Sequence, residues 1–186
     1  MIQKALQFTN EVLQRFLQNK FDLDEDIVIS NNLIDADGSI PQKNKNKVII
    51  SLINLEHETS KPFNVSNKKL HDGNFAMNAP SNRYNLDILV TANFDDYNET
   101  LKFLNAVILF FQINQAIDSS TNSNIPNGIT KLVFDLEKNS YHQMHSLWTA
   151  MGAKYRPSVI YKMRMITLQD DRIKEEIPAI KGLGTN

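Results

Sequence analysis

The sequence predicts an α+β fold, a single domain in which a mixed β-sheet of about five strands is flanked by about three helices. Two neighbouring segments carry this prediction. Across residues 84–92 apolar side chains recur at every second position, which is typical of a strand with one buried face. Residues 101–113 are apolar almost all round, as in a helix that is covered on most of its sides. At 186 residues, the chain is long enough to build one such core.

Acidic residues between these two segments indicate where the helix begins. Asp95, Asp96 and Glu99 lie where unpaired N–H groups and the helix dipole favour carboxylates, so we expect the helix to start near Asp95 or Asp96. Lys102 and Asn105 interrupt the apolar run, and a transmembrane helix needs ~20 predominantly apolar residues. We therefore expect the central helix of a soluble domain, with one face left over for a partner.

The first half of the chain predicts one further helix and two strands. Apolar residues in 2–17 follow the spacing of an amphipathic helix that packs on the sheet. Residues 27–29 predict a short strand, and the apolar run at 48–55 predicts a strand that is covered on both faces in the sheet interior. Residues 56–83 show no clear period and exceed the usual ~12 to 15 residues of a loop, which indicates a mobile or binding segment.

The second half predicts a strand, a short helix and a final strand. A polar linker at 118–128 precedes a strand that ends at residue 136, and the final strand opens at Pro157. Between them, Ser140 and Gln143 have capping-box spacing, and Gly152 suits a left-handed helix end. The apolar face of this helix comprises Tyr141, Met144, Leu147, Trp148 and Met151. We expect a domain at 1–168 and a loose tail at 169–186.

Large apolar side chains in these elements are the expected core. We expect Trp148, Phe103, Phe110, Leu132 and Phe134 to be structural, because large aromatics on an apolar face usually fill a core. For Trp148 the alternative is a direct interface anchor, since tryptophan is also enriched at interfaces.

Composition and motifs argue against several functions. A net charge of -1 gives no basic excess for nucleic acid, and the absence of cysteine excludes disulfides, thiolate metal sites and cysteine nucleophiles. His142 and His145 lack the spacing of a zinc hydrolase, and the acids around Asp37 lack the remaining ligands of a calcium loop. We expect no catalytic residue, no metal and no cofactor.

The residues alone leave two function classes open. An interaction protein with surplus apolar surface is favoured over an enzyme. The alternative is a small mixed-fold enzyme or ligand-binding domain whose site is not visible in the sequence. Polar side chains interrupt the first 20 residues, where no cleavable signal peptide is visible, so we expect synthesis in the cytoplasm, which the resemblance described next would make a bacterial one.

One stretch resembles a known family. Residues 147–165, LWTAMGAKYRPSVIYKMRM, combine a helix end, a proline-started strand and fixed aromatic and basic positions. They resemble the tail-terminator or cap proteins of extracellular contractile injection systems, the phage-tail-like particles of the antifeeding-prophage and virulence-cassette type. Segments 47–56, 85–94, 97–112 and 129–136 occur in the order of that family. The departures are the 56–83 segment and the tail, where we expect this chain to lack the added C-terminal domain of the family.

The resemblance implies a phage tail-terminator-like fold and a structural function without catalysis. It implies a hexameric ring that ends the inner tube and joins it to the last sheath layer. The partners would be copies of the chain, the inner tube protein and the sheath protein, without nucleic acid or direct membrane insertion. The particle would be released extracellularly or anchored to a membrane.

Candidate interface residues follow from the matched segment and from exposed aromatics. Lys162 and Arg164 lie two residues apart on a strand and so share one face, where basic and apolar groups mix. From spacing alone, an ordinary solvated basic face is equally compatible, and the family match favours partner contacts. The full set of candidates is Lys154, Tyr155, Arg156, Tyr161, Lys162, Arg164, Phe63 and Phe75.

Overall fold

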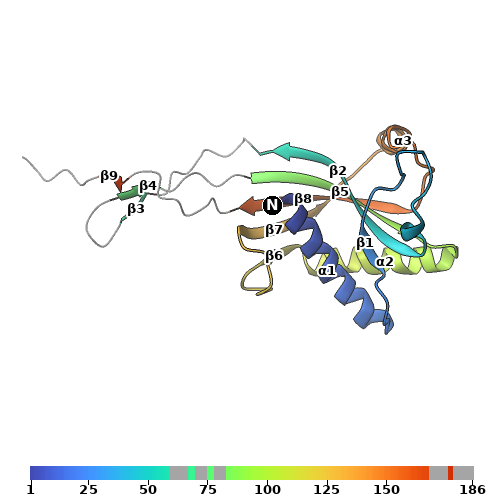
Figure 1. The fold of residues 1–186 in the computed structure, drawn as a ribbon, viewed down its shortest axis with the longest axis horizontal. Coiled ribbons are helices and arrows are strands. Elements are labelled where there is room, and N and C mark those ends of the chain that lie inside the picture. The colour runs from blue at the N-terminus through green and yellow to red at the C-terminus, as the bar shows by residue number, and fades with distance from the viewer. Residues whose placement is uncertain (59–66, 70–74, 78–82, 168–175, 178–186) are drawn as a thin grey trace, which may run out of the picture.

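A computed structural model describes residues 1–58, 67–69, 75–77, 83–167 and 176–177 (Figure 1). Within these residues the helices are α1 (Ile2–Phe21), α2 (Tyr97–Ile113) and α3 (Tyr141–Ala150), together with the short 3-10 helix η1 (Gln42–Asn44). The strands are β1 (Val28–Ser30), β2 (Lys47–His57), β3 (Asn67–Lys69), β4 (Phe75–Met77), β5 (Arg83–Asn93), β6 (Ala116–Asp118), β7 (Ile129–Leu136), β8 (Ser158–Thr167) and β9 (Glu176–Ile177).

The main sheet is mixed, as predicted. Its described strands run in the order β1-β2-β5-β8-β7-β6. Strands β1 and β2 pair in parallel, and the other neighbours pair antiparallel. The sheet has six strands where the sequence predicted about five, and the unpredicted strand is β6. Its three residues lie at the start of a polar segment, too short to show an alternation.

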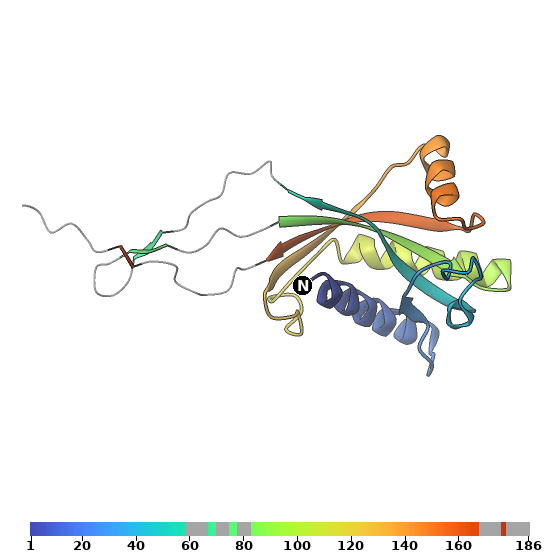
Figure 2. The same cartoon turned by 45° about the horizontal axis from the view of Figure 1, so that its top comes forward.

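Helices cover the two faces of this sheet unequally. Figure 2 shows α1 and α2 side by side on one face and α3 on the other. The larger core lies under α1 and α2, where alternate residues of the strands meet both helices. It contains the predicted core residues Phe103, Phe110, Leu132 and Phe134, all buried. Burying this apolar surface is the main favourable contribution to folding.

The smaller core lies under α3 and explains a residue that interrupts the strand pattern. Leu89 points to the face where its neighbours in β5 are polar, and it packs there with Ile49, Ile160 and Trp148. All four side chains are buried. The structure therefore places Trp148 in a core, where the sequence placed it.

Helix α2 begins at Tyr97, next to the predicted start near Asp95 or Asp96. Asp96 is the N-cap, and its carboxylate accepts a hydrogen bond of 2.8 Å from the backbone N–H of Glu99. One side of the helix is buried against the sheet and α1. Tyr97, Leu101 and Ile113 remain exposed. Tyr97 and Leu101 lie one turn apart on the same side, so part of one face is left uncovered in the subunit, as the sequence indicated.

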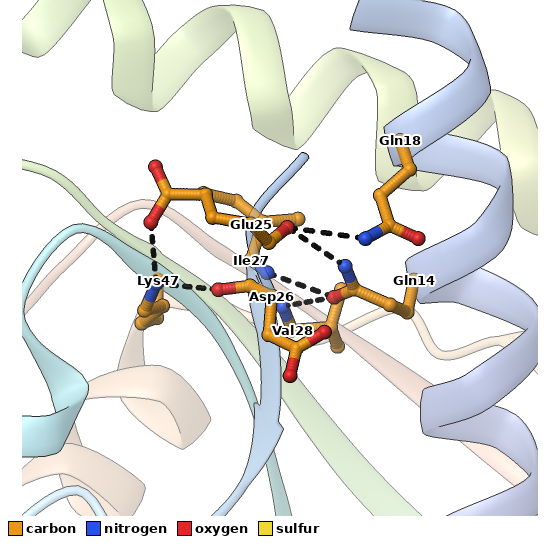
Figure 3. A network of polar contacts seen from close by, with 7 residues as sticks. All are labelled: Gln14, Gln18, Glu25, Asp26, Ile27, Val28 and Lys47. Atoms are coloured by element: carbon orange, nitrogen blue, oxygen red, sulfur yellow. Dashed lines mark hydrogen bonds and ion pairs between the residues drawn. The ribbon is translucent and has the colours of Figure 1, made fainter. Parts of the chain in front are cut away.

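A polar network fixes the end of α1 to the loop that leads into β1 (Figure 3). The Gln14 side-chain oxygen accepts hydrogen bonds from the backbone N–H groups of Ile27 and Val28, at 2.8 and 2.7 Å. Its amide nitrogen donates to the carbonyl oxygen of Glu25 at 3.1 Å. Lys47 reaches the same loop from β2, where it donates to the Asp26 carbonyl and to the Glu25 carboxylate. One glutamine therefore satisfies backbone groups that strand pairing leaves open.

Strand β2 differs from its prediction as a fully covered interior strand. Within the described residues, β1 pairs only with Val48–Ile50, and β2 beyond Ser51 has β5 on one side alone. In that part of the strand, Leu52 and Leu55 are exposed. The strand lies inside the sheet between β1 and β5, as predicted, but its prediction as covered on both faces fails at Leu52 and Leu55, which belong to neither of the two buried clusters.

Helix α3 has the predicted ends. The Ser140 side chain accepts from the Gln143 N–H, the Gln143 side chain accepts from the Ser140 N–H, and Gly152 has a left-handed φ of 66°. The prediction for Tyr141 was wrong, because this side chain is almost fully exposed. It sits at the first helical position and borders the hollow along α3.

Part of the 56–83 segment is regular structure. Strand β2 extends to His57 and β5 starts at Arg83, while β3 and β4 pair antiparallel between them. In the C-terminal region, β9 pairs with β4 to complete a second, three-stranded sheet. The remaining residues of both segments lie outside the described part of the chain. The division into a 1–168 domain and a 169–186 tail stays a prediction.

Candidate assembly interface

Lys162 lies at the centre of a group of carboxylates on the sheet face opposite α1 and α2. Its Nζ is 3.6 Å from Glu137 Oε1, 3.8 Å from Glu56 Oε2 and 4.0 Å from Asp87 Oδ1. Strand register causes this grouping, since β8 runs between β5 and β7 and pairs Lys162 with Asp87 and Asp135. The lysine side chain is only 25% exposed. It therefore holds together acids that would otherwise repel one another.

Arg164 lies two residues further along the same strand face and is more accessible. Its Nε is 2.9 Å from Asp135 Oδ2, and the side chain is 54% exposed. An ion pair at this exposure contributes only ~0 to 1 kcal/mol to stability. The guanidinium group carries five N–H donors in a planar fork, so it can bind a further carboxylate.

Lys154, Tyr155 and Arg156 form the turn between α3 and β8, called the basic loop from here on. Gly152 makes the sharp turn that ends α3, and Pro157 leads into β8. Lys154 and Tyr155 are exposed, and Arg156 is half-buried. Among the described residues, neither cation has a carboxylate within ion-pairing distance. The loop thus offers two unpaired cations around one exposed aromatic ring.

Two hollows border the basic loop. One, of about 310 Å³, lies between the loop and the start of α2, where Phe94 and Tyr97 line it. The other, of about 620 Å³, lies along α3 and is lined by Met144, His145 and Trp148. Tyr155 lines both hollows. The exposed ring therefore stands between two concave surfaces, a shape suited to interlocking with another protein.

Three of the predicted interface residues have no accessible side chain among those that the structure describes. Tyr161 is 3% exposed and packs in the larger core, where burial raises its pKa to about 12. We leave it out of the interface for that reason. Phe63 lies outside the described residues, and of Phe75 the structure describes the backbone, which pairs in β4. The remaining candidates split into two accessible groups: the basic loop, and Lys162 with Arg164.

The described part of the chain contains neither a metal-binding cluster nor a membrane-spanning helix. No group of three or more His, Asp or Glu side chains there is arranged to hold a metal ion. His142 and His145 lie on α3, and no third ligand among those residues joins them. No helix within the same residues is long and apolar enough to cross a membrane.

Comparison with known proteins identifies the family. The profile of the Pvc16 N-terminal domain matches residues 9–181. The chain belongs to this family. The match confirms the resemblance found in residues 147–165, and it extends over nearly the whole chain. A search of curated proteins gives no match.

Solved structures share the fold of this Pvc16 N-terminal domain. The sheath/tube terminator of the PVC extracellular contractile injection system, in its extended state, has a TM-score of 0.65 and 13% identity over 100% of this chain. The tube-terminating cap of the anti-feeding prophage has a TM-score of 0.62 and 14% identity over 96% of this chain. The chain spans 62% and 60% of the lengths of those two proteins. At these identities the likeness establishes a common fold.

Sequence reasoning missed one surface of the domain. A hollow of about 350 Å³ lies beside the start of α2, between Leu23 and Phe94, and four carboxylates line it. They come from residues about 70 positions apart, Glu25 in one segment and Asp95, Asp96 and Glu99 in another. Both acidic runs are visible in the sequence. Only the packing of α1 against α2 brings them together.

Proposed function

We propose that the chain is the structural cap, or tail terminator, of a contractile injection system. The observation that carries this proposal is the fold, which coincides over essentially all of the chain with two proteins described as a sheath/tube terminator and a tube-terminating cap. Membership of the Pvc16 N-terminal domain family supports it independently of the fold. A protein of this kind acts by binding, so we assign the chain no reaction.

In this proposal six copies form a ring that ends the inner tube and joins it to the last sheath layer. A ring subunit needs two complementary surfaces for its neighbours and further surfaces for tube and sheath. The domain offers several accessible surfaces of different chemistry: the basic loop, the exposed face of α2 around Leu101, and the charged sheet face around Arg164. Such diversity supports a subunit that contacts several partners at once.

The charged sheet face is our candidate for contact with tube or sheath. Arg164 is accessible, and the arginine fork recognises carboxylates with defined geometry. Lys162 and its three acids present further charged groups beside it. We propose that residues 1–168 carry these contacts and that the particle acts outside the producing cell.

Locating the chain in purified particles tests the proposal. A chain with an epitope tag should be labelled by antibody at the end of the particle opposite the baseplate, and image averaging of that end should give sixfold symmetry. Labelling along the whole particle, or at the baseplate, would contradict the proposal. A deletion strain complemented with untagged protein controls for nonspecific labelling.

A further inference from the structure

We propose that a pocket between α3 and the loop 31–46 binds a protein segment in which an aliphatic side chain adjoins a carboxylate. Besides the two hollows that Tyr155 lines, the basic loop borders this third hollow, of about 220 Å³. We call it the anion pocket, and the residues that line it include Leu33, Ile40, Ile49, Trp148, Lys154 and Arg156. That another protein of the particle supplies the segment rests on the proposed function.

Buried asparagine side chains hold the loop wall of the anion pocket in place. Asn44 is fully buried, and its amide nitrogen donates to the Asn32 carbonyl at 2.8 Å. Its side-chain oxygen accepts from Asn31 Nδ2 at 2.7 Å, and its backbone carbonyl accepts from Asn93 Nδ2 at 2.6 Å. Figure 1 shows the loop that they fix beside α3. The pocket is therefore preformed, so binding does not have to order this wall.

The charged part of the lining is cationic. Lys154 and Arg156 line the pocket, and no acid does so among the described residues. Neither cation has a carboxylate within ion-pairing distance in that part of the chain. The Asp37 carboxylate of the same loop accepts from the N–H and hydroxyl of Ser39. Asp95 lines a different hollow with the two cations and already pairs with a lysine at 3.2 Å. An outside carboxylate would thus meet two unpaired cations.

The remaining wall is largely apolar and limits what can carry the carboxylate. Leu33, Ile49 and Trp148 belong to the smaller core and line the pocket. Ile40 lines it as well and is 49% exposed, so an apolar group of a partner can cover it. Pockets for small molecules usually measure about 300–1,000 Å³. A volume of about 220 Å³ suits one aliphatic side chain better than a cofactor.

Peptide titration of the full chain tests the pocket. The probe is N-acetyl-leucyl-glutamyl amide, and the matched neutral probe has glutamine in place of glutamate. We expect saturable changes of the amide NMR signals of residues 33–40 and 152–156. The dissociation constant should be about fivefold lower for the glutamate probe, because hydrogen bonds to a charged group are stronger than neutral ones.

Three variants assign this preference to the pocket. K154Q/R156Q removes both cations and should bind the two probes equally. Ile40→Glu places a carboxylate at an exposed position of the wall and should also abolish the preference. The matched control Arg15→Gln removes an exposed cation on α1, which lies on the other face of the sheet from α3, and should keep the preference (Figure 2).

Three results of the titration would overturn the pocket. They are no saturable change at residues 33–40 and 152–156, equal affinity of the parent chain for both probes, and an undiminished preference in folded K154Q/R156Q. Inorganic phosphate is the further competitor. Displacement of the glutamate probe by an equal concentration of phosphate would show a general anion site without use of the apolar wall, and would also contradict the proposal.

Photocrosslinking in assembled particles identifies the partner. A photoreactive amino acid at Ile40 should give an adduct with a tube or sheath peptide in which an aliphatic residue adjoins an acid. An adduct with another copy of this chain alone would contradict the assignment to a partner. Failure of the titration leaves the cap function standing. Absence of the chain from particle ends would remove the cap function and leave the peptide pocket of the isolated chain.

Discussion

Trp148 and Tyr155 meet edge to face across the turn after α3, with ring centroids 5.6 Å apart and ring planes at 64°. The first ring is 4% exposed and the second is 66% exposed. One turn thus joins a core residue to an accessible one. Segment 147–165, which resembles the family, therefore contributes to both the core and the surface. Its helical part buries Trp148, and the loop that follows exposes Tyr155.

Truncating these two rings should have opposite effects. Trp148→Ala should lower the unfolding free energy by ~3 to 5 kcal/mol, because it leaves a cavity in the smaller core. The Tm should fall by several degrees. Tyr155→Ala should cost under about 1 kcal/mol but abolish ring formation. Thermal unfolding and mass photometry on both variants measure this. An unchanged Tm in Trp148→Ala with lost assembly would make Trp148 an interface anchor.

Gln14 should be a key residue of the α1 attachment. Gln14→Ala removes the acceptor of the Ile27 and Val28 N–H groups, so urea unfolding should show a loss of about 1 to 3 kcal/mol. Gln18→Ala is the matched control, because Gln18 makes a single exposed hydrogen bond of 3.2 Å to the Glu25 carbonyl and should matter little. Equal losses in both variants would show that the two buried backbone groups find other partners.

Lys162 and Arg164 should differ in stability although they share a strand face. Arg164→Ala should change the unfolding free energy by at most about 1 kcal/mol, since its ion pair is half exposed. Lys162→Ala should cost more, because three acids lose the cation they share, and 1 M salt should reduce this loss by screening. A loss that is independent of salt would indicate lost packing of the lysine stem instead.

The burial of Tyr161 predicts that the domain loses stability at alkaline pH. Burial raises its pKa from 10.0 in the unfolded chain to about 12 in the folded one, so between these values the folded state binds more protons. The unfolding free energy should therefore begin to fall as pH passes about 10 and continue to fall up to about 12. Tyr161→Phe should lack this component of the decline. Identical pH profiles of parent and variant would refute it.

Local chemistry is the part of the fold that could be predicted from the sequence. The Asp96 cap, the Ser140 capping box and the left-handed Gly152 each depend on neighbouring residues, and all three occur in the structure. The alternation in β5 likewise identified its buried face. Leu89 seemed to break that pattern, and it is explained only by Trp148, 59 positions later, which covers it from α3.

Features that depend on distant pairing could not be predicted. The exposure of Leu52 depends on where the helix-covered clusters end along β2, and the burial of Tyr161 depends on Phe111 of α2, which packs on it. Lys162 was predicted to contact a partner, whereas strand register surrounds it with acids of its own chain. The hollow between Leu23 and Phe94 is lined by carboxylates from two distant segments, which meet only in the folded chain. The spacing of apolar residues along a single sequence does not show which distant elements come into contact.

The length of inner tubes tests the central claim most directly. Purified tube protein of the same particle is allowed to polymerise with increasing amounts of the chain, and tube lengths are measured by electron microscopy. If the chain is a cap, mean length should fall as its amount rises, and each short tube should carry extra density at one end. An unchanged length distribution at saturating chain, with bare tube ends, would contradict the account.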